Sequence, residues 1–156
     1  MKISRLSLLA LIPALALFFA TPSSAQAPDG QFGIQAGTYG FGLQYALSPS
    51  LQIGTLLALT QGDFQTDQTI LTPYVKFLLE GDPVNPFITA GIQYEDLGGG
   101  SDITILAGFG LDYYASENIG VFGHFDVFAL GEDALGESAL GFGIFNGKVG
   151  VEWFFD

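Results

Sequence analysis

The chain has 156 residues, of which 49% are hydrophobic, 14% aromatic and only 13% charged, and its formal net charge is −12. A soluble domain usually carries about a quarter charged residues, so the surface of this chain is short of charge. The acidic balance disfavours nucleic acid as a partner, because binding a polyanion requires Lys and Arg. Cysteine is absent, which excludes disulfides and cysteine-based metal sites.

Residues 1–25 have the three parts of a secretory signal peptide. A basic start precedes an apolar run from Leu6 to Ala20, and a small-residue cleavage pattern ends at Ala25. A transmembrane anchor is the alternative, but the run contains Pro13 and is shorter than the roughly 20 apolar residues that span a bilayer. We therefore expect a cleaved leader at 1–25 and one domain at 26–156.

Eight segments follow in which apolar residues alternate with small or polar ones. Clusters of Gly, Pro, Asn, Asp and Ser separate them, as is typical of strands joined by turns. The segments cover, in chain order, residues 32–37, 41–48, 51–60, 69–80, 87–95, 102–113, 118–127 and 148–155.

The composition of the two faces distinguishes a membrane barrel from a soluble one. A soluble, ligand-holding periplasmic β-barrel would alternate too, with a strongly polar outer face. Here the less apolar face consists mainly of Gly, Ala, Thr and Gln, and the other of Leu, Ile, Val and Phe. Such faces suit a crowded lumen and a lipid-facing wall. The fold class predicted is all-β, an eight-stranded antiparallel up-and-down transmembrane β-barrel.

The connections between the segments differ in length. Short ones at Ser48–Ser50, Glu80–Pro86 and Ala115–Asn118 alternate with longer ones at Gln61–Gln68, Asp96–Ser101 and Gly131–Gly143. Short turns are periplasmic and longer loops external in outer-membrane barrels. An interfacial aromatic girdle is then expected near the periplasmic rim, formed by Tyr45, Phe77, Tyr113, Trp153 and Phe155.

Three places depart from regular alternation. Pro73 lies inside a predicted strand, where it cannot donate a ladder hydrogen bond, so we expect a β-bulge there. The phase changes between Ala36 and Phe41, which predicts a tight hairpin or a bulge. Phe142 is out of phase with Val149, so the start of the last strand stays open.

The region from Gln31 to Phe155 resembles the small eight-stranded outer-membrane barrels of the OmpA/OmpX-like type. The resemblance rests on the repeated strand pattern, the Gly-aromatic run Gly37–Gly42 and the ending Lys148–Phe155, after which Asp156 departs from the pattern. It implies a monomer integral to the bacterial outer membrane, with membrane lipid as a partner. It also implies that the barrel-assembly machinery recognises the C-terminal strand.

The inward face carries the residues that could do chemistry. Eight strands enclose a space that side chains can fill, and Tyr74, Phe122 and Phe128 are large inward groups, so a general diffusion porin is disfavoured. Glu80 and Glu95 also face inward in this pattern. Because an unpaired charge in a lumen is costly, we expect a charge network formed by Lys76, Asp112, His124, Asp126, Lys148 and Glu152.

The sequence indicates the function less directly than it indicates the fold. We expect a non-enzymatic envelope protein that serves envelope integrity or surface interaction through its external loops, without metal or cofactor. A narrow cation-leaning channel is the alternative, because inward carboxylates outnumber lysines. A lipid A-modifying enzyme is a third possibility that would depend on His124 and Asp126, but no serine is placed beside them.

Overall fold

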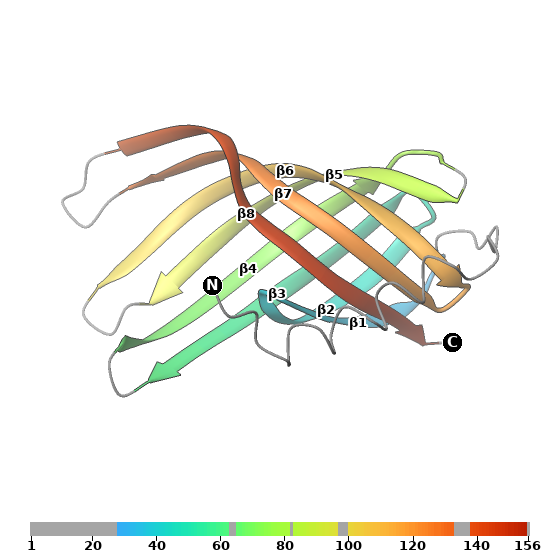
Figure 1. Cartoon of the computed structure of the whole chain (residues 1–156), viewed down its shortest axis with the longest axis horizontal. Coiled ribbons are helices and arrows are strands. Elements are labelled where there is room, and N and C mark those ends of the chain that lie inside the picture. Colours follow the sequence, from blue (N-terminus) through green and yellow to red (C-terminus); the bar gives the residue numbers. More distant parts are fainter. Residues whose placement is uncertain (1–27, 63–64, 82, 97–99, 133–137, 156) are drawn as a thin grey trace, which may run out of the picture.

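The computed structural model describes residues 28–62, 65–81, 83–96, 100–132 and 138–155; the predicted signal peptide, 1–25, lies outside them. The described residues form eight strands (Figure 1): β1 (Phe32–Gly37), β2 (Gly40–Ser48), β3 (Leu51–Gly62), β4 (Gln65–Leu78), β5 (Val84–Asp96), β6 (Ser101–Ser116), β7 (Ile119–Glu132) and β8 (Ser138–Phe155). In these ranges no helical segment has the length and apolarity that a membrane crossing needs.

Each strand pairs antiparallel with its neighbours in the chain, and β1 pairs with β8 to close the barrel. The closing register runs from Phe32 opposite Phe155 to Gly37 opposite Gly150. This confirms the predicted eight-stranded, antiparallel, up-and-down barrel. We call the end with the connections at 49–50, 79–83 and 117–118 the turn end, and the opposite end the loop end (Figure 1).

The period of two seen in the sequence separates an outer from an inner face. On β6, Ile103, Phe109 and Leu111 are 57%, 47% and 54% exposed. The alternate residues Asp112 and Tyr114 are fully buried. Successive side chains of a strand point to opposite faces, so the outer wall is apolar and the lumen holds the polar groups.

Two of the predicted long connections are largely strand. β3 continues to Gly62 and β4 begins at Gln65, while β7 continues to Glu132 and β8 begins at Ser138. The prediction of a loop was therefore wrong for much of 61–68 and 131–143. Backbone pairing extends a hairpin without needing strongly apolar side chains, so weak alternation did not mark where these strands end.

The structure shows a hairpin at the first irregular place in the alternation and a gap in the ladder at Pro73. Ala36 and Phe41 face each other across a tight hairpin whose turn residues are Thr38 and Tyr39. Pro73 pairs in register with Thr55 of β3. No register shift accompanies it on the β5 side, where only the pairs at 72 and 73 are missing. The bulge expected at Pro73 is therefore wrong, and a gap in the ladder takes its place.

β8 is one strand with a phase change inside it. Its pairing with β7 shifts register between His124 and Asp126 and again between Asp126 and Phe128. Asn146 lies at this point with a φ of 50°, a conformation that non-glycine residues rarely adopt. The irregularity explains why Phe142 and Val149 are out of phase although both are exposed. Figure 1 shows β8 changing direction midway along its length.

Candidate functional site

The lumen near the turn end is closed by a buried ion cluster. Lys76 Nζ lies 2.7 Å from Asp112 Oδ2 and 3.1 Å from Glu152 Oε2, so strands β4, β6 and β8 each contribute one charge. Gln44 Nε2 donates to Glu152 Oε2 at 3.0 Å. All four side chains are at least nine-tenths buried. The cluster therefore ties four strands together across the lumen.

Apolar side chains complete this plug. Ala46, Tyr114 and Phe154 are fully buried, and the Tyr114 hydroxyl accepts a hydrogen bond from Gln52 Nε2 at 3.0 Å. Lys76 Nζ also stands 5.0 Å from the centroid of the Phe87 ring, a cation–π distance. The Lys76 ammonium is therefore held by ion pairs and an aromatic ring in place of water molecules.

The charges of the plug do not balance formally. One lysine faces two carboxylates, and the oxygens Asp112 Oδ1 and Glu152 Oε1 are buried without a hydrogen-bond donor among the described residues. A buried carboxylate of this kind depends strongly on the cation beside it. Lys76 is therefore the residue on which the plug depends most.

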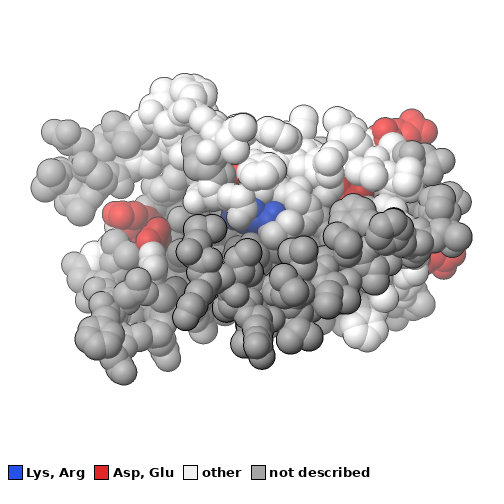
Figure 2. Space-filling model, viewed as in Figure 1, with Lys and Arg blue, Asp and Glu red and all other residues white. Residues whose placement is uncertain are grey.

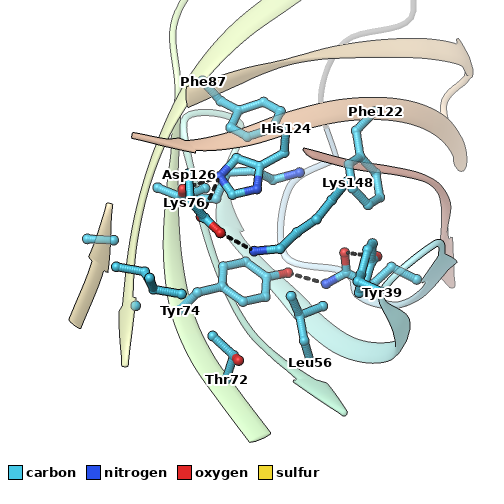
Figure 3. A pocket seen from close by; sticks show the side chains of 15 residues that line it. Tyr39, Leu56, Thr72, Tyr74, Lys76, Phe87, Phe122, His124, Asp126 and Lys148 are labelled. Carbon is cyan, nitrogen blue, oxygen red and sulfur yellow. Dashed lines mark hydrogen bonds and ion pairs between the residues drawn. The ribbon is translucent and has the colours of Figure 1, made fainter. Parts of the chain in front are cut away.

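A second cluster lies in the middle of the lumen (Figure 3). Lys148 Nζ is 2.8 Å from Asp126 Oδ2, and His124 Nε2 is 3.5 Å from Asp126 Oδ1. The same ring nitrogen lies 2.8 Å from Thr89 Oγ1, and the ring stacks on Phe87 with centroids 5.8 Å apart. These contacts hold the His124 ring in place in the lumen. A serine, which a catalytic triad would need, is not among the contacts.

A chain of glutamine and tyrosine side chains extends from the first cluster through Gln44, and sequence reasoning did not assign it to a site. Tyr39 donates to Gln35 Oε1 at 2.9 Å, Gln35 donates to the Tyr74 hydroxyl, and Tyr74 donates to Gln44 Oε1 at 3.1 Å. Gln35, Gln44 and Gln52 recur at inward positions of the first three strands. That recurrence was the signal in the sequence that could have identified this network.

The space left in the lumen is unequal along the axis. A cavity of about 50 Å³ lies in the middle, against His124, Asp126 and Phe87. A larger one of about 510 Å³ lies toward the loop end. Tyr39 and Lys148 line both cavities, so the larger space stands directly above the second cluster. The lumen is filled near the turn end and open toward the loop end.

The predicted aromatic girdle lies on the outer face at the turn end. Phe77, Trp153 and Phe155 are 48%, 54% and 43% exposed, and the Trp153 and Phe155 rings stack at 5.5 Å. Tyr45 and Tyr113 are half-buried at the same end of β2 and β6. Phe32 belongs to the same band, with its ring 5.2 Å from that of Tyr45, and the prediction missed it.

Two predicted inward residues, Glu80 and Phe128, have other positions. Glu80 is exposed because β4 ends at Leu78. Phe128 pairs with Ala107 and Phe142, which are in outward rows, because a register shift on β7 changes its phase. Glu95 keeps its predicted inward position: it lines the lumen toward the loop end and accepts hydrogen bonds from Gln68 and from Gln93.

No metal-binding group of three or more His, Asp or Glu side chains occurs in the described ranges. Comparison with protein-family models, with curated proteins and with solved structures finds no match for this chain. The arguments for function therefore rest on the geometry of the barrel.

Proposed function

We propose that this chain is an integral protein of the bacterial outer membrane, a monomeric β-barrel that neither conducts freely nor catalyses a reaction. In this proposal it serves envelope integrity or surface interaction through its loop end. The observation that carries the proposal is the combination of an apolar outer wall with a lumen closed by a buried ion cluster.

The outer wall supports a place in the membrane. The outward residues of β6 from Ile103 to Tyr113 are apolar or aromatic, and a run of this length matches the 9–11 residues of a tilted membrane strand. A soluble barrel with so many exposed Leu, Ile and Phe side chains would present a large patch for association. The aromatic band at the turn end matches the interfacial girdles of membrane barrels, and residues 1–25 supply the export signal.

The filled lumen supports a non-conducting protein. The plug around Lys76 fills the lumen between β2, β3, β4, β6 and β8 with side chains that are hydrogen-bonded or ion-paired to one another. An ion would have to break these bonds in order to pass. A general diffusion pore needs a wider barrel than eight strands provide.

The second candidate is a narrow channel that favours cations. It is supported by the excess of carboxylates in the plug, where Asp112 and Glu152 share one lysine. Any path through this cluster would attract cations and repel anions.

Gel mobility of the protein from isolated outer membranes tests the first part of the proposal. We expect the unheated sample to migrate differently from the boiled one, because a folded membrane barrel resists detergent. Planar bilayers then test conductance, and we expect no discrete channel events. Steps selective for cations would replace the proposal by the second candidate. Recovery in the soluble periplasmic fraction, without a heat shift, would contradict membrane insertion.

A further inference from the structure

The barrel wall is incomplete on one side. The β1–β2 hairpin ends at Gly37 and Gly40, whereas its neighbours β3 and β8 continue toward the loop end. In the described part of the chain, β3 beyond Leu57 pairs only with β4, and β8 before Val149 pairs with β7. We call the resulting opening the notch: its edges are Ala58–Leu59 of β3 and Asn146–Lys148 of β8, and its floor is Thr38–Tyr39.

The backbone at the β8 edge keeps the notch open. On the β8 side, Val149 exchanges hydrogen bonds with Thr38, through its carbonyl oxygen at 3.0 Å and its amide at 3.2 Å. Directly beyond this contact, Asn146 has the φ of 50° that redirects β8. Figure 2 shows a small area of lysine surface near the centre of one face of the molecule. The lumen is therefore accessible from the side of the barrel.

The cavity of about 510 Å³ lies behind the notch, since residues of both edges and of the floor line it. Its volume lies in the range of about 300–1,000 Å³ that is usual for small-molecule sites. Leu56, Ala58 and Ile70 form an apolar wall on β3 and β4, and Thr72 and Gln93 offer polar groups beside it. This division suits a ligand with an aliphatic chain and a polar head.

The charges at the cavity indicate an uncharged head. Lys148 is already paired with Asp126 at 2.8 Å, and Glu95 accepts hydrogen bonds from Gln68 and from Gln93. A charged ligand would lose water and would compete for partners that these groups already occupy, which is costly in a confined site. A hydroxyl head needs only hydrogen bonds from neutral side chains.

The height of the notch indicates where the ligand comes from. The hairpin floor ends about midway along the barrel, and exposed apolar residues continue past it toward the loop end, as far as Leu59 on β3 and Ile103 on β6. The notch therefore opens through the apolar wall and not above it. We propose that the cavity behind the notch binds an uncharged single-chain amphiphile that enters sideways from the membrane. This inference rests on the proposed membrane location.

The test uses the barrel folded in nanodiscs of dimyristoyl phosphatidylcholine, with 1-monolauroylglycerol as the probe and native mass spectrometry to count bound molecules. We expect one saturable site per barrel. Ala58→Phe fills the cavity from β3, and Ile70→Trp fills it from β4, so each should weaken binding by about tenfold or more. Thr55→Phe is the matched control: Thr55 pairs with Leu43, which is 56% exposed, and binding should not change.

Charged probes test whether the site selects a ligand with an uncharged head. Laurate and dodecyltrimethylammonium carry the same chain length with opposite charges, and each should bind about tenfold more weakly than 1-monolauroylglycerol. Equal binding of all three would overturn the assignment of an uncharged head. A folded, heat-modifiable barrel with no saturable adduct, or with binding unaffected by Ala58→Phe and Ile70→Trp, would overturn the cavity site alone. A chain without a heat shift would overturn the proposed function and the membrane route together.

Discussion

The turn-end half of the barrel is filled by large inward side chains and a buried ion cluster, whereas the loop-end half surrounds a cavity of about 510 Å³. In both halves the strands are antiparallel and their side chains alternate between the two faces. The difference arises because Gln, Tyr and Phe occupy inward positions in one half and the β1–β2 hairpin stops short of the other. One strand pattern thus supports a filled base and an open space in the same barrel.

Removing the Lys76 cation from the plug should change the stability of the barrel more than any other substitution predicted below. Lys76→Met leaves Asp112 and Glu152 buried without their ion partner, which should lower the free energy of unfolding by about 3–5 kcal/mol. Urea titration of the barrel in lipid vesicles, followed by tryptophan fluorescence, measures it.

Lys148→Met is the matched control for the loop-end half. Lys148 pairs with Asp126 beside the cavity, and its side chain is more exposed than that of Lys76, 14% against 5%. Its loss should cost less than half as much, because it leaves one carboxylate instead of two, and Asp126 lines a cavity of about 50 Å³ that has room for water. Equal losses for the two variants would contradict the view that only the turn-end half is sealed.

Arginine substitution on the outer face should have the next largest effect. Phe109 lies near the middle of the outward run of β6 and Ile103 near its loop-end limit. If the wall faces lipid, Phe109→Arg should cost about 2–4 kcal/mol and Ile103→Arg about 0–1 kcal/mol. The same unfolding measurement in vesicles compares them, and similar small costs at both positions would count against membrane insertion.

An added methyl group should destabilise the turn-end half more than the loop-end half, because the turn-end half is more tightly packed. A Cβ at Gly110 would meet the carbonyl oxygen of Gly123 and the ring of Phe87, whereas at Gly141 the nearest atom would be 3.9 Å away. Gly110→Ala should therefore cost about 1–3 kcal/mol through overpacking, and Gly141→Ala less than about 0.5 kcal/mol. Thermal or urea unfolding distinguishes them, and the reverse order would show that the base is not tightly packed.

Restoring a backbone donor should have the smallest effect, and it should stabilise the barrel. A Cβ at Gly91 would lie 2.8 Å from the carbonyl oxygen of Pro73, so that oxygen faces β5. In an antiparallel ladder the nitrogen of the same residue faces the same neighbour. Pro73→Thr should therefore supply the missing β4–β5 hydrogen bond and add about 1 kcal/mol. Hydrogen exchange at residue 73 measures protection, and a destabilised, unprotected strand would contradict this geometry.

Much of the barrel could be predicted because a period of two persists through each strand. It placed Phe109 outside and Asp112 inside, and it put Lys148 beside Asp126, which the structure shows 2.8 Å apart. Phe128 was misplaced because one register shift reverses the phase of everything beyond it. The Gln35–Tyr74–Gln44 network was not predicted, because neutral side chains cannot be paired from the sequence in the way that opposite charges can.

The sequence by itself determined the class of fold and the polarity of its two faces, because alternation of side chains along a strand is a local property. The tertiary structure decided which inward groups meet, since Lys76, Asp112 and Glu152 come from three strands whose register is set only when the barrel closes. It also decided the notch, because the height at which a short hairpin ends relative to β3 and β8 depends on the stagger of all eight strands.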